Sequence, residues 1–185
     1  MHPTTLRVGF VPGVEPDRFL RRWKSGRRQA WLELVPVALS RQHAVLETGE
    51  VDMCFVRLPL TDEALHLVPL WEERAAIVVG TENVLSLLDE VGPEDLEGET
   101  EIPAAHADDA AERIAVAAAG VGFTRVPLSL ARLHHRKDAV SRPLREAPPT
   151  RIALAWPRAA DDPLRALEPL SPIPPLDPSP KEHHR

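Results

Sequence analysis

Short apolar runs alternate with amphipathic segments in the N-terminal part of the chain. Residues 6–11, 31–37 and 51–58 are apolar and rich in β-branched side chains, and they predict buried strands. Between them, residues 16–26 and 40–49 carry apolar side chains at helical spacing, which predicts two helices. Strands and helices in this order are typical of an α/β fold with a mostly parallel sheet and right-handed crossovers.

The pattern continues beyond residue 60 with less regularity. Apolar runs predict strands and polar periodic stretches predict helices, so we expect strands at 66–71, 75–80, 121–126, 139–144 and 152–156, and helices at 82–92, at 108–119, after Pro127 and at 161–167. Asp108 and Asp109 would lie in the first turn of their helix, where carboxylates complement the helix dipole, and Gly120 would end it. The proline-rich residues 169–185 predict a disordered tail.

Three strand ends are the first candidates for a binding site. Ligands of parallel sheets bind at the carboxyl ends of the strands. Those ends are residues 12–14, 37–38 and 57–59, and we expect them to lie near one another. The residues predicted to contact a ligand are Pro12, Gly13, Val14, Arg57 and Leu58 from these ends, together with Gly122 and Phe123 from a Gly-x-Gly turn later in the chain.

Arg57 is the strongest single candidate in this set. A guanidinium group at a strand end can hold a carboxylate through two hydrogen bonds. The alternative, which the sequence leaves open, is a salt bridge to a nearby acid such as Glu15 or Asp62. Backbone amides after Gly13 are a second candidate for an anion, although Glu15 would repel one.

Two basic clusters have structural explanations that we favour over functional ones. Arg18, Arg21, Arg22 and Arg28 would form the solvated face of the first helix, or alternatively a phosphate-binding or dimerisation surface. His134, His135 and Arg136 would lie at a helix C-terminus, where positive side chains complement the dipole. Adjacent histidines on a helix diverge by about 100°, so they rarely bind one metal ion. An interface role for this cluster is the next choice.

Composition narrows the class of protein. The chain has 185 residues, 43% of them hydrophobic and 27% charged, and a net charge of −6, so bulk charge provides no attraction to nucleic acids or anionic membranes. A single cysteine, the absence of a signal peptide and the absence of a long apolar run predict a cytoplasmic location. No motif for nucleophilic, phosphate-binding or metal chemistry is recognisable, so we expect neither an enzyme nor a cofactor.

Several segments taken together resemble a known family. The segments LRVGFVPG, LELVPV, VLETGEVDMCFVRLPL, HLVPLWEERAAIVVG and VAAAGVGFTRVPLSLARL are similar, in this order, to the effector-binding domain of LysR-type transcriptional regulators. LHHRKDAV followed by IALAW resembles an actinobacterial branch of these domains.

The resemblance implies a type II periplasmic-binding-protein-like fold, with lobe I at 6–80 and 138–168 and lobe II at 81–137. It also implies a small effector, such as an organic acid, and a role in transcriptional regulation. Compared with the family, this chain begins at the first strand without a winged helix-turn-helix, so a stand-alone domain is expected. About a dozen residues separate Leu96 from Asp108, which predicts a reduced second lobe. The alternative is a protein-interaction module that forms a homodimer or joins a partner regulator, with a degenerate cleft. Direct DNA binding is disfavoured.

Overall fold

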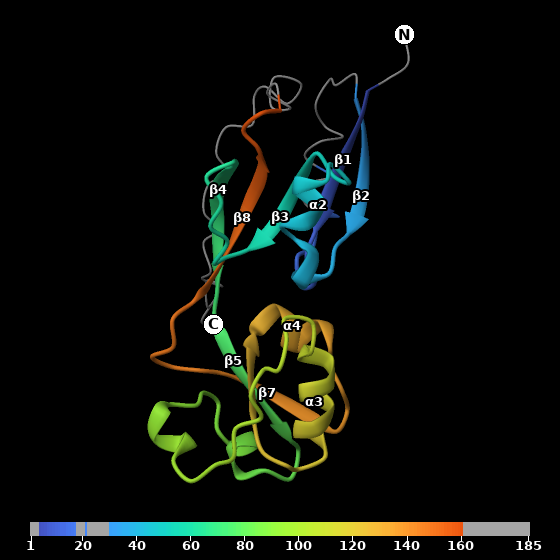
Figure 1. Cartoon of the computed structure of the whole chain (residues 1–185). Helices are drawn as coiled ribbons and strands as arrows, with labels where there is room; N and C mark the ends of the chain where they lie inside the picture. The colour runs from blue at the N-terminus through green and yellow to red at the C-terminus, as the bar shows by residue number, and fades with distance from the viewer. Residues whose placement is uncertain (1–3, 18–20, 22–29, 161–185) are drawn as a thin grey trace, which may run out of the picture.

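The computed structural model describes residues 4–17, 21 and 30–160, and its strands form two sheets. Figure 1 shows the sheets one above the other, joined by two connecting segments. The first sheet has the order β2-β1-β3-β8-β4. Its strands are β1 (Thr4–Phe10), β2 (Ala30–Pro36), β3 (Met53–Arg57), β4 (Leu65–Glu73) and β8 (Thr150–Pro157).

The first sheet is mixed rather than uniformly parallel. β1 pairs in parallel with both β2 and β3, as the sequence predicts, whereas β8 runs antiparallel to both β3 and β4. The five residues of β3 are all buried, because this central strand is covered on both faces. The carboxyl ends of β1, β2, β3 and β4 therefore lie at one edge of the sheet, and β8 enters from that edge.

The second sheet is smaller and antiparallel. It consists of β6 (Thr124–Pro127), β5 (Ala75–Gly80) and β7 (Ala139–Pro143), with β5 in the centre. Helices α3 (Ala110–Ala118) and α4 (Leu128–Leu133) pack on it through Ile114 and Leu130. The fold is thus the mixed α/β, two-lobed architecture that the sequence predicts.

The boundaries between the two lobes lie at other residues than predicted. The predicted first lobe contained residues 75–80 and 139–144, but β5 pairs with β6 and β7, so both segments belong to the second sheet. The chain crosses between the sheets from Glu73 to Ala75 and again from Pro143 to Thr150. Apolar runs of this kind predict that a strand is buried, but they carry no information about which sheet buries it.

Two predicted helices are shorter than expected. Residues 40–49 form a 3₁₀ turn η1 (Leu39–Arg41) and a short helix α2 (Ala44–Glu47), and residues 82–92 contain only the turn η2 (Val84–Leu87). Ser40, the predicted N-cap, lies within the 3₁₀ turn, whose N-cap is Ala38, and its backbone amide donates to the carboxylate of Asp108 in the other lobe.

A further turn, η3, spans Pro93–Leu96. Gly120 ends α3 as predicted, with a φ of 89°, the left-handed conformation that favours glycine. The amide of Arg7 in β1 donates to Asp52 at 2.7 Å, which ties the start of β3 to its neighbour. The helices predicted at 16–26 and 161–167 and the proline-rich tail lie outside the described residues, apart from positions 16, 17 and 21.

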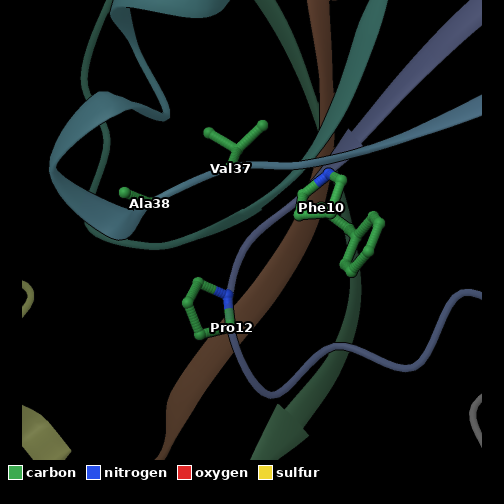
Figure 2. Close-up of a pocket in the computed structure, with 5 residues that line it drawn as sticks. Phe10, Pro12, Val37 and Ala38 are labelled. Atoms are coloured by element: carbon green, nitrogen blue, oxygen red, sulfur yellow. The ribbon is translucent and has the colours of Figure 1, made fainter.

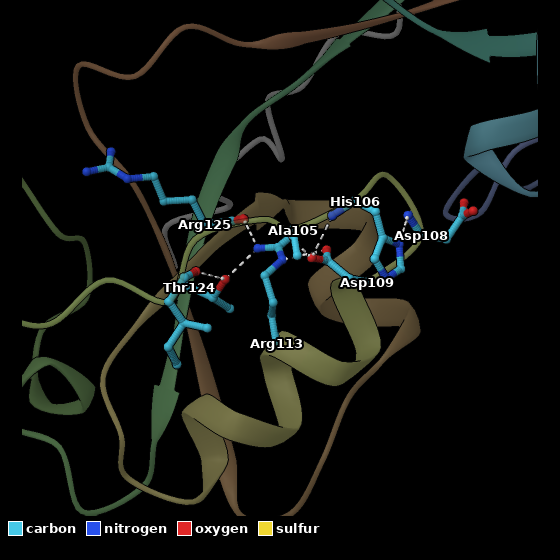
Figure 3. A network of polar contacts seen from close by, with 8 residues as sticks. Ala105, His106, Asp108, Asp109, Arg113, Thr124 and Arg125 are labelled. Carbon is cyan, nitrogen blue, oxygen red and sulfur yellow. Dashed lines mark hydrogen bonds and ion pairs between the residues drawn. The ribbon is translucent and has the colours of Figure 1, made fainter.

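A buried polar network holds the short segment that leads into α3 (Figure 3). The carboxylate of Asp109 is 3% exposed and accepts hydrogen bonds from the amides of Ala105 (2.6 Å) and His106 (3.2 Å) and from Nε of Arg113 (2.7 Å). Burial raises the pKa of Asp109, but these hydrogen bonds outweigh it and hold the pKa below its ordinary value. The helix begins at Ala110, so Asp109 lies at the N-cap rather than in the first turn as predicted, and its carboxylate organises the preceding segment.

The same arginine extends the network to β6. Nη1 of Arg113 donates to the hydroxyl group of Thr124 and, at 2.8 Å, to the carbonyl of Arg125, while Thr124 donates to the carbonyl of Ile102 at 3.1 Å. The segment before α3 is thereby fixed to the second sheet by side chains, because it contributes only an isolated bridge, Glu101 to Phe123, to the backbone pairing.

Candidate effector site

A small apolar hollow lies where β1 and β2 end (Figure 2). Its volume is about 200 Å³ and it is lined by Phe10, Pro12, Pro36, Val37 and Ala38. Pro12 from one predicted strand end and Val37 and Ala38 from another thus line the same hollow. The hollow is partly open to solvent, and the residues that line it are apolar.

Local backbone constraints shape this hollow. Phe10 and Pro36 are paired residues in the parallel ladder, and the amide of Val37 donates to the carbonyl of Phe10 at 3.0 Å, one step beyond the strand. Pro36 has no N–H group, and β2 is an edge strand of the sheet, the position in which a proline is tolerated. Ala38 then begins the 3₁₀ turn, so the chain bends away from the strand end.

Arg57, at the end of β3, does not line this hollow but is hydrogen-bonded to the lining residue Pro12, and its guanidinium group is already paired. Its side chain is 5% exposed and that of Glu73, at the end of β4, is 8% exposed. Nη2 and Nε of Arg57 donate to Oε2 of Glu73 at 3.0 and 3.3 Å. The sequence left a salt bridge to Glu15 or Asp62 open as the alternative to ligand binding; a salt bridge exists, but its partner is Glu73.

The remaining contacts of Arg57 connect the hollow to the second lobe. Nη1 donates to the carbonyl of Pro12 at 3.0 Å, and Nη2 donates to the hydroxyl group of Ser129 in α4 at 3.1 Å. Gly13 lies against the same hydroxyl group: with a φ of 90°, it occupies a conformation suited to glycine, and an added Cβ would lie 2.6 Å from Oγ of Ser129. The two lobes therefore meet at Gly13, Arg57 and Ser129.

The backbone of Arg57 is held by a side chain. The amide of Arg57 donates to Oε1 of Gln42 and its carbonyl accepts from Nε2 of Gln42, both at 2.9 Å. β1 pairs with β3 only as far as Phe55, so the buried amide of Gln42 satisfies the backbone groups that lie two residues further along β3. This arrangement fixes the direction in which the Arg57 side chain leaves the strand.

A second polar contact joins the lobes on the β2 side. Oδ1 of Asp108 accepts a hydrogen bond from the amide of Ser40 at 3.0 Å. Hydrogen bonds from the hydroxyl group and the amide of Ser40 lower the pKa of Asp108 below its ordinary value. Asp108 is exposed, so this contact is more accessible to solvent than the one at Arg57.

The other residues predicted at the first-lobe strand ends pack into the protein. Val14 is 5% exposed in the first-lobe core and its amide donates to Val11 within the turn, so it is not directed at a ligand. Leu58 is half-buried against a second apolar cluster of the same lobe, and its amide donates to the carbonyl of Arg151. Of the predicted contacts, Pro12, Gly13 and Arg57 are therefore the ones that come together.

Gly122 and Phe123 do not form a wall of this site, contrary to expectation. Phe123 is 2% exposed and packs in the second-lobe core with Ile77 and Leu144. Gly122 is a glycine for a packing reason, because an added Cβ would overlap the carbonyl oxygen of Thr100. The Gly-x-Gly pattern here marks a close approach of two backbone segments rather than a binding turn.

One basic cluster follows α4, and most of the other lies outside the residues that the structure describes. Arg21 is exposed, while Arg18, Arg22 and Arg28 lie outside the described residues. His134 follows α4, its amide donating to the carbonyl of Leu130, and Arg136 binds Asp138 through two hydrogen bonds of 2.8 and 2.9 Å. Within residues 4–17, 21 and 30–160, no group of three potential metal ligands is assembled.

The sequence alone did not identify the residues that contact Arg57. Glu73, Ser129 and Gln42 come from three separate segments, and only the fold brings them together. Glu73 carried one usable signal, since it is an acid at the carboxyl end of a strand, where ligand-site residues gather. Ser129 and Gln42 had none, because an isolated polar residue in a helical pattern is indistinguishable from a solvated one.

Comparison with known proteins adds family and fold to this geometry. The family model described as LysR substrate binding domain matches residues 2–102. No sequence among curated proteins gives a match. None of the helices that the structure describes has the length and apolar character needed to cross a membrane.

Solved structures resemble the chain over most of its length. An OxyR regulatory domain mutant from Pseudomonas aeruginosa is 21% identical, with 89% of this chain and 93% of that chain covered and a TM-score of 0.68. The BenM effector binding domain with its effector benzoate is 21% identical, with 84% of each chain covered and a TM-score of 0.67. A Corynebacterium glutamicum OxyR mutant is 18% identical, with 90% and 62% covered and a TM-score of 0.70. These similarities establish a shared fold.

Proposed function

Because the chain belongs to the LysR substrate-binding domain family, we propose that it binds a small effector in the hollow at the ends of β1 and β2. The family binds small effectors for transcriptional regulation and is not enzymatic. We extend that role to this chain as a cytoplasmic regulatory module, and its assignment to an actinobacterial branch stays a prediction.

One observation carries this proposal: the hollow lies beside the contact between the lobes. Pro12 lines the hollow and accepts a hydrogen bond from Arg57, which in turn donates to Ser129 of α4. A ligand at Pro12 would therefore touch a residue that is linked to the other lobe through Arg57. Occupancy of the hollow can thus influence how the lobes meet, which is what an effector site requires.

The volume of the hollow limits the size of the effector. Drug-sized ligands occupy pockets of about 300–1,000 Å³, so a hollow of about 200 Å³ suits a compound with one ring or a short branched chain. Benzoate, which BenM binds, has this size. The expected organic acid rests on Arg57, and the pairing of Arg57 with Glu73 weakens that part of the expectation.

A binding experiment with a filled hollow tests the proposal. Monocyclic and short branched compounds, both acids and uncharged analogues, are titrated into the 185-residue chain by calorimetry, with thermal shift as the first screen. Ala38→Leu adds three carbon atoms at an exposed lining position and should weaken binding by about tenfold or more. Ala64→Leu, also exposed but next to the start of β4 at the opposite end of the sheet, should leave it within about twofold.

The result that contradicts the proposal is equally definite. Either no compound of this size binds, or Ala38→Leu and Ala64→Leu bind the ligand alike. The former outcome would favour the second candidate, a dimerisation or partner-binding module with a degenerate cleft. The small volume of the hollow supports that candidate. Light scattering then decides it, since a monomer that captures no partner regulator excludes that role.

A further inference from the structure

We propose that Glu73 determines the class of effector: by neutralising Arg57 at the edge of the hollow, it makes the site prefer uncharged compounds to carboxylates. This inference rests on the proposed function, because it concerns the ligand of the same hollow. It departs from the organic acid that Arg57 alone predicts.

The first step is the burial of the charge pair. Both side chains are more than nine-tenths buried, and Oε2 of Glu73 accepts two hydrogen bonds from Arg57. A buried guanidinium group needs a counter-charge, since an unpaired charge removed from water is strongly unfavourable. Glu73 supplies that counter-charge from within the protein, so the site does not depend on a ligand to provide it.

The second step is the position of the pair next to the hollow. Arg57 reaches Pro12, a lining residue, through its Nη1 donor, and reaches Ser129 through Nη2. Together with Glu73, these contacts use the Nε donor, one Nη1 donor and two Nη2 donors of the guanidinium group. A ligand carboxylate could pair with Arg57 only by displacing Glu73 or by entering beside it.

Both routes are unfavourable for an anion. Displacement leaves Glu73 as a buried carboxylate without its partner, and entry beside Glu73 places two negative charges close together in a poorly solvated region. An uncharged ligand of the same shape meets neither penalty. The other described lining residues are apolar, so they offer no charge that would compensate a carboxylate.

Benzoate and benzamide are matched probes for this selectivity, because they share a ring and differ in charge. The wild-type chain should bind benzamide at least about tenfold more tightly than benzoate. Glu73→Gln keeps the shape of the side chain and leaves the Arg57 charge uncompensated, so it should reverse the order and strengthen benzoate binding by about tenfold or more. Glu72→Gln, an exposed neighbour paired with Arg151, should keep the wild-type order.

A double variant separates charge from folding. Arg57→Met with Glu73→Leu removes both charges and retains apolar volume, a change that buried ion pairs tolerate. It should fold and should show no gain of benzoate binding, since the guanidinium group is absent. If circular dichroism shows that Glu73→Gln is unfolded, the ratio of benzamide to benzoate affinity in the wild type and in the double variant still tests the role of Glu73.

The outcomes distinguish this inference from the proposed function. A wild-type chain that prefers benzoate, or a folded Glu73→Gln variant that keeps the preference for benzamide, overturns the role of Glu73 while leaving effector binding intact. Binding of neither probe, nor of any other compound in the calorimetric screen, to any variant overturns the proposed function and with it this inference.

Discussion

Two buried arginine–carboxylate pairs in this molecule have similar geometry and different consequences. Arg57 and Glu73 are 3.0 Å apart with side chains 5% and 8% exposed, and Arg113 and Asp109 are 2.7 Å apart with side chains 13% and 3% exposed. The first pair joins the ends of two strands and contacts the other lobe. The second pair spans one turn of α3 and stabilises its own lobe.

The difference lies in what each carboxylate does besides neutralising an arginine. Asp109 also accepts two backbone amides, so its removal would leave both a charge and N–H groups without partners. Among the described residues Glu73 accepts hydrogen bonds from Arg57 and from no backbone amide, whereas both arginines keep two further acceptors of their own. The Asp109 pair is therefore mainly structural, whereas the Arg57 pair can tolerate change and can influence a ligand.

The largest expected effect is the loss of Asp109. Asp109→Ala should destabilise the second lobe by about 3–5 kcal/mol, because it leaves Arg113 buried without its counter-charge. The free energy of unfolding from urea titration measures this. Asp138→Ala removes the carboxylate of an exposed arginine pair and should leave the unfolding midpoint unchanged within error. Equal small effects from both substitutions would contradict the structural role of Asp109.

A smaller effect is expected at the other pair. Glu73→Gln should lower the free energy of unfolding by about 1–3 kcal/mol, less than Asp109→Ala, because glutamine keeps a side-chain oxygen that can accept from Arg57 and no backbone amide loses its partner. The double variant Arg57→Met with Glu73→Leu should be close to the wild type in stability. If Glu73→Gln costs as much as Asp109→Ala, the distinction between the two pairs is wrong.

The Asp109 pair should also appear in the pH dependence of stability. The pKa of Asp109 is lower in the folded than in the unfolded chain. The contribution of this carboxylate to stability is therefore fully present above the unfolded pKa of about 3.9 and is lost as pH falls through the folded pKa. The stability difference between the wild type and Asp109→Asn should therefore be constant from pH 7 to 5 and shrink in more acidic solution. Thermal unfolding at several pH values measures it, and a difference that stays constant down to pH 2 contradicts the assignment.

The smallest effect concerns a probe in the first lobe. Cys54 is fully buried, and burial raises the pKa of its thiol to about 12, so alkylation at pH 8 should be very slow in the native chain. If Asp109 stabilises only the second lobe, Cys54 in the Asp109→Ala variant should still be alkylated very slowly in the absence of denaturant. Rapid labelling of Cys54 in that variant, measured by mass spectrometry, would show that the two lobes unfold together.

The sequence predicted the strands of the first sheet better than it predicted sheet membership or the buried ion pair, for physical reasons. The strands of the first sheet follow from local β-branched runs, and Pro12, Val37 and Ala38 from two of the predicted strand ends line the same hollow. The assignment of 75–80 to the first lobe failed because sheet membership depends on distant partners. Arg57 was found from its position, but its pairing with Glu73 arises from tertiary structure that no local spacing records.

The most direct test of the central claim, that a small ligand occupies the strand-end hollow, is methyl NMR of the labelled chain during titration with benzamide. Val37 and Ala38 line the hollow, whereas Val79 lies in the second-lobe core and serves as the reference. We predict saturable shifts of the Val37 and Ala38 methyl signals, with Val79 nearly unchanged. Saturable binding that leaves Val37 and Ala38 unperturbed would place the ligand elsewhere and contradict the account.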